Sequence, residues 1–280
     1  MADLPFHRES LHAFTLLELI IVLAVLSVLV VLQAAAIPHA KSQTQTAGCT
    51  SNLRRLTLAW FMYAGDNGGF LPGNLDGSGP DSQTNLTWCA GWLDNTTFRS
   101  DNTNAALVMQ SQLGKYAQTP TIYRCPADPS RSRDHTGSTG LPRVRSVSMN
   151  GYVGQLSSGR PYTAGYRNFK RIDDFSDPAP AQAFVFMDER EDSINDGWFA
   201  VDMSSYSPRR PASDVIEDVP ADWHDRGAGL SFADGHTETW HWQDARTTPP
   251  HVPGSIALGV SSPRNVDVAR IQGASSRPLK

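Results

Sequence analysis

Five residues in the C-terminal part of the chain could bind a metal ion: His224, Asp234, His236, Glu238 and His241. In an extended strand, His236 and Glu238 point to one face and His241 points to the other. His224 could reach back to a turn at Asp234. We expect His224 to hydrogen-bond the Asp234 carboxylate and so to fix the hairpin to the preceding loop. There are two alternatives: the group binds a metal ion, or His224 and Asp234 make no direct contact.

The densest group of acidic side chains lies between residues 188 and 197, which read D-E-R-E-D-S-I-N-D-G. Oxygen ligands at such close spacing suit Ca²⁺. The spacing does not fit the EF-hand pattern, because the apolar Ile194 takes the middle ligand position between Asp192 and Asp196. We therefore expect a solvated acidic turn and no cofactor, with calcium as the alternative. The calcium ligands would be Asp188, Glu189, Asp192 and Asp196.

The three cysteines, Cys49, Cys89 and Cys125, are too few for a disulfide scaffold. They also lack the paired C-x₂-C spacing of a zinc site. One disulfide with one remaining thiol, or three separate buried thiols, are both open. No Ser or Cys lies in the sequence context of a nucleophile, so no catalytic triad is indicated and we expect no enzymatic activity.

The composition is typical of a folded domain that can bury a sizeable core, with 280 residues of which 40% are hydrophobic. The formal net charge is −4 and the two signs are mixed, so no broad basic surface is present and no nucleic-acid partner is expected. The 22 Gly and 19 Pro residues indicate many turns.

The most distinctive element is the N-terminal segment. Residues 19–32 are apolar except for Ser27, and the run extends over residues 14–37. A helix of that length spans roughly 36 Å at about 1.5 Å per residue, enough to cross a bilayer core of about 30 Å. We therefore expect a transmembrane segment at 14–37 behind a short leader at 1–13. Glu18 would cost on the order of 2.5–3.5 kcal/mol there, so it should have a partner.

Residues 13–18, A-F-T-L-L-E, resemble the prepilin cleavage and methylation motif, which is followed at once by a long apolar helix. The resemblance implies that a prepilin peptidase cuts between Ala13 and Phe14 and methylates the new N-terminus. It also implies that Glu18 of one subunit pairs with the terminal amine of its neighbour. Ala13 departs from the usual Gly before the cut. A secretory signal cut at residues 34–36, or an uncut anchor, are the alternatives, but neither explains Glu18.

This processing implies a single-pass protein of the bacterial inner membrane, with a cytoplasmic leader and a periplasmic C-terminal domain, in which the membrane itself is a partner. The orientation rests on the cleavage motif alone. Arg8 in the leader is accompanied by Asp3 and Glu9, so the positive-inside rule adds little.

Helical periodicity resumes after the apolar run. Cys49, Leu53, Leu56, Trp60 and Tyr63 fall on one face, and the sequence D-N-G-G follows them. We expect one long helix over residues 14–65. Its amphipathic half, residues 38–65, should pack into the domain.

The rest of the chain predicts a β-rich, loop-rich globular domain over residues 66–243. Strands are expected at 144–149, 183–187, 197–201 and 230–233. Asp234-Gly235 between alternating runs predicts a hairpin with a two-residue type I′ turn. The Pro-rich segment 244–280 has no sustained period and should be loosely ordered. The expected fold class is α+β and pilin-like: a long membrane-spanning helix packed on a domain with an antiparallel sheet.

His224, nine intervening residues and then Asp234-Gly235 are similar to a His-x₉-Asp-Gly pattern near the C-terminus of many pilin-like proteins, notably from planctomycete and verrucomicrobial bacteria. The short motifs around Cys49 and Cys125 are also similar to that group. The resemblance implies a Cys49–Cys125 disulfide that ties the helix to the domain, with Cys89 left over.

These resemblances imply a structural, non-enzymatic subunit of a type II secretion or type IV pilus-like filament. Its partners would be the prepilin peptidase and identical or related subunits, bound through the N-terminal helix. A secreted or tethered module that binds carbohydrate or metal is the main alternative. An anchored hydrolase would need a cleft with paired carboxylates, which a sequence cannot reveal.

Overall fold

The computed structural model describes residues 15–75, 83–154, 165–206, 211–251 and 258–279. The chain divides into two units, Met1–Thr44 and Gln45–Lys280. Each unit is considered by itself below. Helix α1 (Leu16–Asp66) contributes its first part to one unit and residues 45–66 to the other.

In the first unit, α1 begins with a capping box. The Glu18 backbone N–H donates to Thr15 Oγ1 at 3.2 Å, and the Thr15 backbone N–H donates to Glu18 Oε2 at 2.8 Å. These bonds satisfy backbone groups that an α-helix leaves open at its first turn. Glu18 is therefore the residue that completes the helix start.

The predicted transmembrane segment is contradicted. Among the residues that the structure describes, no helix is long and apolar enough to cross a membrane. The membrane-spanning part of the predicted fold class is thus wrong, and so is the predicted single-pass placement in the inner membrane. The predicted leader lies outside the described residues.

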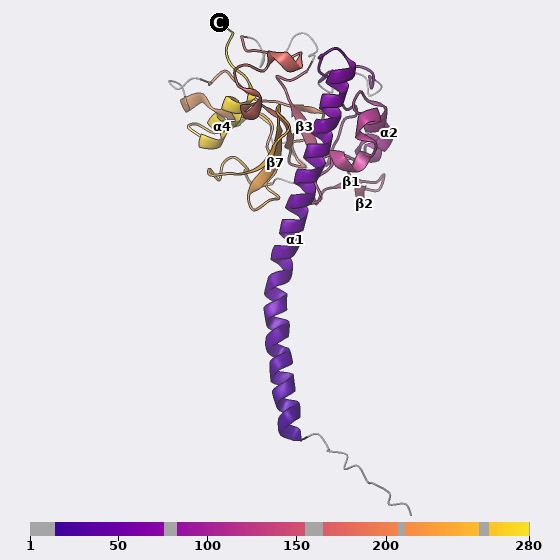
Figure 1. Ribbon diagram of the computed structural model, residues 1–280, viewed down its shortest axis with the longest axis vertical. Helices are drawn as coiled ribbons and strands as arrows, with labels where there is room; N and C mark the ends of the chain where they lie inside the picture. Colours follow the sequence, from indigo (N-terminus) through magenta and orange to yellow (C-terminus); the bar gives the residue numbers. More distant parts are fainter. Residues whose placement is uncertain (1–14, 76–82, 155–164, 207–210, 252–257, 280) are drawn as a thin grey trace, which may run out of the picture. The chain divides into compact units, whose positions relative to one another are not determined.

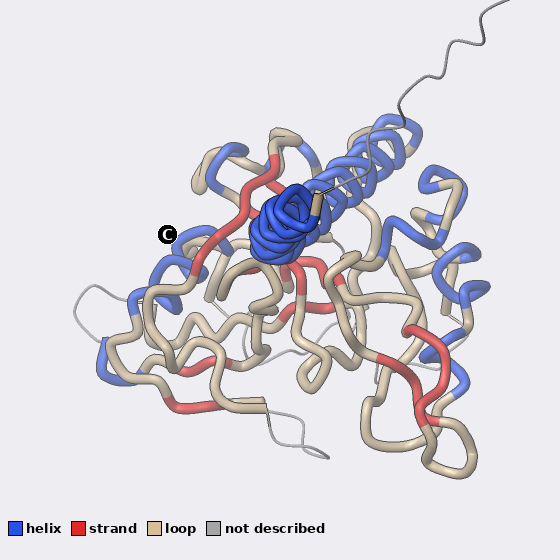
Figure 2. Tube along the Cα trace, turned by 90° about the horizontal axis from the view of Figure 1, so that it is seen from below, coloured by secondary structure: helices blue, strands red, loops and turns tan. Residues whose placement is uncertain are grey.

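In the second unit, residues 45–66 of α1 pack on the sheet, as both views show (Figures 1 and 2). The predicted amphipathic face is confirmed, because Cys49, Leu53, Leu56 and Trp60 are buried. The helix ends at Asp66, and Gly68 and Gly69 follow it at positive φ. Gly69 donates its N–H to the Ala64 carbonyl at 2.8 Å, so the expected glycine stop is also confirmed.

The central sheet has five strands. Their order is β5 (Trp198–Phe199), β3 (Val147–Asn150), β4 (Phe184–Asp188), β7 (Gly227–Phe232) and β8 (Thr237–His241). Strands β3 and β5 are parallel and the other neighbours are antiparallel. Every residue of β3, β4 and β7 is buried, so both faces of the sheet centre are covered. The fold is mixed α+β.

The expected hairpin joins β7 to β8, but its turn differs from the prediction. Phe232 donates its N–H to His236 O, and Gly235 donates its N–H to Phe232 O. Gly235 has φ 93°, whereas Asp234 keeps a negative φ. The loop is therefore a three-residue loop with glycine at the left-handed position, and not a type I′ turn. The structure has strands that overlap the four expected ranges: β3 overlaps 144–149, β4 overlaps 183–187, β5 overlaps 197–201 and β7 overlaps 230–233.

Shorter elements surround this sheet. Within the described ranges there are two further strand pairs, β1 (Arg131–Arg133) with β2 (Thr139–Pro142), and β6 (Val215–Ile216) with β9 (Val260–Ser261). The short helices are η1 (Ser100–Thr103), α2 (Ala105–Gln110), α3 (Gly114–Ala117), η2 (Pro120–Tyr123), η4 (Ile172–Asp174), η5 (Pro180–Gln182) and η6 (Pro211–Ser213).

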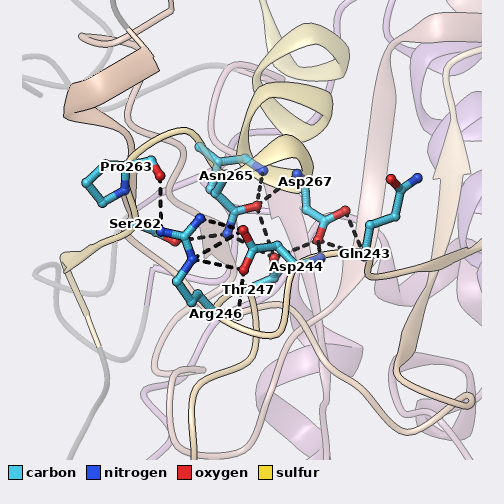
Figure 3. A network of polar contacts seen from close by, with 9 residues as sticks. Gln243, Asp244, Arg246, Thr247, Ser262, Pro263, Asn265 and Asp267 are labelled. Carbon is cyan, nitrogen blue, oxygen red and sulfur yellow. Dashed lines mark hydrogen bonds and ion pairs between the residues drawn. The ribbon is translucent and has the colours of Figure 1, made fainter.

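The segment predicted to be a loosely ordered tail instead contains helix α4 (Val266–Ser275). Figure 3 shows the polar network that holds it. The buried Asp267 carboxylate accepts the backbone N–H groups of Gln243 and Asp244 at 2.9 and 2.8 Å, and the Thr247 hydroxyl at 2.7 Å. Asn265 caps the helix. A buried carboxylate with several donors orders a stretch in which no periodic pattern was visible.

We expect Leu56→Ala to lower the free energy of unfolding by about 2–5 kcal/mol, because it leaves a cavity between α1 and the sheet. Leu58→Ala on the same helix is the matched control, since Leu58 is 58% exposed and Leu56 is fully buried. The control should change the free energy by less than about 0.5 kcal/mol. Urea titration followed by tryptophan fluorescence measures both. Equal losses in the two variants would contradict the observed packing.

Candidate metal centre

Four buried side chains from distant parts of the second unit converge beneath α1: Cys49, Cys125, Asp188 and His224. One ligand atom from each lies within 4.8 Å of every other. Cys49 is on α1, Cys125 follows η2, Asp188 ends β4 and His224 precedes β7. Within the described part of the chain, no other group of three or more Cys, His, Asp or Glu residues has this arrangement.

The contacts within this cluster are short. Cys49 Sγ lies 2.9 Å from Asp188 Oδ2, and Cys125 Sγ lies 3.2 Å from His224 Nε2. His224 Nε2 is 3.6 Å from Asp188 Oδ2. The two sulfurs, the ring nitrogen and the carboxylate oxygen therefore point toward one common centre.

Strand β7 makes room for this group at Gly229. A Cβ atom on Gly229 would lie 2.8 Å from Cys49 Sγ and 2.9 Å from Asp188 Oδ2. Because glycine has no side chain, the helix and the carboxylate can both approach the strand. The Gly229 N–H also donates to Asp188 Oδ2 at 3.1 Å, which orients the carboxylate.

His224 is held on both sides of its ring. Its Nδ1 lies 3.0 Å from the Thr46 hydroxyl oxygen on α1, so Nε2 faces the cluster. The next two residues, Asp225 and Arg226, have φ 52° and 58°, and their tight turn leads directly into β7. The ring is held by its contacts with Thr46, Cys125 and Asp188.

The pKa values of the side chains in the cluster are shifted in different directions. The hydrogen bond to Cys125, burial and the nearby Asp188 raise the pKa of Cys49 well above its usual value. The same hydrogen bond from Cys49, aided by His224, lowers the pKa of Cys125 against burial. Burial opposes the charged form of His224, but hydrogen bonds to Asp188 and Cys125 outweigh it and raise its pKa to about 9. Cys125 is thus the thiol that most readily becomes a thiolate.

Such a group can bind a metal ion, form a disulfide or supply a nucleophile. All three cysteines are free in the structure, so the expected Cys49–Cys125 bond is not present, although both sulfurs belong to the cluster. A nucleophile must reach its substrate, and both thiols are 1% exposed. Two sulfurs, an imidazole and a carboxylate are ligands that zinc accepts.

The acidic residues that were candidates for calcium do not converge. Glu189 accepts the Ser148 and Ser193 hydroxyls at 2.5 and 2.8 Å, and burial raises its pKa to about 8. Asp192 pairs with Arg190 at 2.6 Å, and Asp196 accepts the Trp198 N–H at 2.8 Å. Only Asp188 belongs to the candidate metal centre. The expected solvated turn is also wrong, because these carboxylates are buried.

The expected pairing of His224 with Asp234 is not formed. Asp234 Oδ1 instead lies 2.5 Å from His236 Nδ1 within the same turn. The local contact forms readily because the two residues lie in one tight loop, so bringing them together costs little loop-closure entropy. Gly235 does take the turn position that needs positive φ. His241 Nδ1 lies 3.0 Å from the Asp225 carbonyl.

The residues of the expected processing site are only partly described. Ala13 and Phe14 lie outside the described residues. Hydrogen bonds from the Thr15 backbone and side chain lower the pKa of Glu18. Glu18 is thus a helix cap in this structure, and its expected pairing with a neighbour's amine stays a prediction.

The spacing of Cys49, Cys125, Asp188 and His224 along the chain does not predict that they cluster, because each residue comes from a different element. One weak signal was present: Cys49, Cys125 and His224 each lie in a short motif that was singled out for its resemblance. Asp188 was noticed only as part of the acidic stretch.

We expect Gly229→Ala to lower the free energy of unfolding by about 1–3 kcal/mol, because the new methyl group collides with Cys49 and Asp188. Gly65→Ala on α1 is the control, since a Cβ there meets no atom within 4 Å. The control should be neutral or up to about 1 kcal/mol more stable, because alanine favours the helix. Urea titration distinguishes them. If Gly229→Ala were as stable as the control, the close approach of α1 to β7 would be incorrect.

In comparisons with known proteins, no family model, no curated protein and no solved structure matches the chain. The pilin-like resemblance therefore rests on the short motifs of the sequence. The candidate metal centre rests on its own geometry.

Proposed function

We propose that this chain is a structural, pilin-like filament subunit that assembles with further copies of itself through the first part of α1. Its main support is the apolar surface of that helix. Eleven large apolar side chains between residues 16 and 29 are 44–73% exposed. A helix that is apolar on all sides is stable in water only when something covers it.

The chemistry of this segment suits association between like helices. Each Leu, Ile or Val that becomes fully buried contributes about 1.5–3 kcal/mol, so a bundle of such helices is strongly favoured. Glu18 is the one charged side chain between residues 16 and 29. In a bundle, it would need a cation, and the amine released by cleavage before Phe14 would supply one. A subunit offset by a fixed axial step could place that amine beside Glu18.

The second candidate function is a module that binds carbohydrate or metal. Trp240 and Trp242 on the hairpin are 5% and 4% exposed, so they do not form an open aromatic surface on which a sugar ring could stack. The buried cluster described above favours a metal inside the fold rather than a ligand at its surface. We therefore propose filament assembly ahead of a ligand-binding module.

Processing is tested by mass spectrometry of the N-terminus of the protein purified from the cells that produce it. We expect the chain to begin at Phe14 and to carry one methyl group on its amine. An intact Met1, or a start at Ile37, would contradict the pilin-like proposal. Either result would move the binding module to first place.

Assembly is tested by sedimentation velocity and electron microscopy of the full chain and two variants. We expect Leu26→Asp to abolish assembly, because it places a charge in the apolar segment. Leu58→Asp is the matched control, since Leu58 is also exposed on α1 but lies outside residues 16–29. The control should assemble as the wild type does. Glu18→Ala should be processed normally yet fail to assemble. Assembly of Leu26→Asp at the wild-type level would refute the proposal.

A further inference from the structure

The geometry points to a structural zinc site formed by Cys49, Cys125, Asp188 and His224. The inference is independent of filament assembly, because all four residues belong to the second unit. A tetrahedral site with Zn–S near 2.3 Å and Zn–N or Zn–O near 2.0–2.2 Å has ligand-to-ligand edges of roughly 3.4–3.8 Å. The contact of 3.6 Å falls within this range, and the contacts of 2.9 and 3.2 Å, each of which involves a thiol, are shorter than it. Small outward shifts of the two thiols would admit the ion.

A second observation concerns Asp188. Its Oδ2 accepts the Gly229 N–H and faces both Cys49 and His224. Its Oδ1 is buried and has no hydrogen-bond partner within the described part of the chain. A buried carboxylate oxygen without a donor is costly, and a bound cation would offset that cost. His224 is the cationic partner of Oδ2 at 3.6 Å, whereas Oδ1 has no donor among the described residues and is free to face a bound cation.

The groups behind the ligands are arranged as metal ligands require. Thr46 accepts or donates at His224 Nδ1, which leaves Nε2 directed at the centre. The Ala127 N–H lies 3.3 Å from Cys125 Sγ, so it can stabilise a thiolate there. Contacts of this kind hold the orientation of ligands and typically change metal affinity 10–100-fold when they are removed.

The ligand set selects the metal and its role. Two thiolates and an imidazole favour zinc over calcium or magnesium, which prefer oxygen ligands. Four protein ligands complete a tetrahedron, so the site leaves no position for a substrate and is structural. The ion would join α1, the loop after η2, the end of β4 and the loop before β7. It would thereby fix the helix on the sheet.

Zinc binding is tested on the full chain, prepared reduced and then dialysed with zinc. We expect one zinc ion per chain by elemental analysis in the wild type and in Cys89→Ser, the control for a buried thiol outside the cluster. Cys125→Ser and His224→Gln should lose the ion. Thr46→Val should retain the ion but bind it with about 10–100-fold lower affinity, because it removes only the support of the His224 ring.

Two measurements on the wild type keep the test decisive if a ligand variant fails to fold. Cobalt added to the metal-free chain should give the intense visible absorption of a tetrahedral ion and a near-ultraviolet band from thiolate. A chelator should lower the urea midpoint, and zinc should restore it. A metal-free chain with no cobalt spectrum would overturn the inference. So would a native chain with an intact Cys49–Cys125 disulfide, or full zinc occupancy in a folded Cys125→Ser.

Discussion

Helix α1 approaches strand β7 at Gly229, where any side chain would collide with Cys49, Leu53 and Asp188. Much of the second unit depends on this contact. It lets one face of the helix bury Cys49, Leu53, Leu56 and Trp60 over the centre of the sheet. It also brings a helix thiol to the end of β4. Close packing of a helix on a strand normally excludes polar groups, and here the absent side chain provides the space for them.

The two parts of α1 differ in how their apolar side chains are distributed around the helix. Residues 45–66 show the one-sided pattern of a helix that packs on a core, with Leu56 buried and Leu58 exposed two residues later. Residues 16–29 are apolar all round, and their side chains are exposed. The first pattern stabilises a fold within one chain. The second leaves apolar surface exposed in its own unit, and cover of that surface by further copies is the physical basis for the assembly that we propose.

Buried ionisable side chains hold the loop between β4 and β5. Arg145 donates to the carbonyl oxygens of Val147 and Asp196 at 3.2 and 2.5 Å, and Glu189 accepts two serine hydroxyls. Asp192 pairs with Arg190. A charge inside a protein is tolerated only with partners, so each of these groups holds its loop in one position. Among the described residues, three buried atoms of these groups have no hydrogen-bond partner: Arg145 Nε, Asp188 Oδ1 and Glu191 Oε2.

The sequence alone determined the elements whose signals are local. The amphipathic face from Cys49 to Trp60, the glycine stop after Asp66 and the hairpin at Asp234-Gly235 all follow from a helical period, a cap or a turn residue. Four predictions were wrong: that the apolar helix spans a membrane, that His224 pairs with Asp234, that the acidic stretch is solvated, and that the C-terminal segment is loosely ordered. In each of those cases the outcome depends on what lies nearby in space. Only the tertiary structure decided that Cys49, Cys125, Asp188 and His224 meet, because they come from four elements and no spacing along a chain encodes such a convergence.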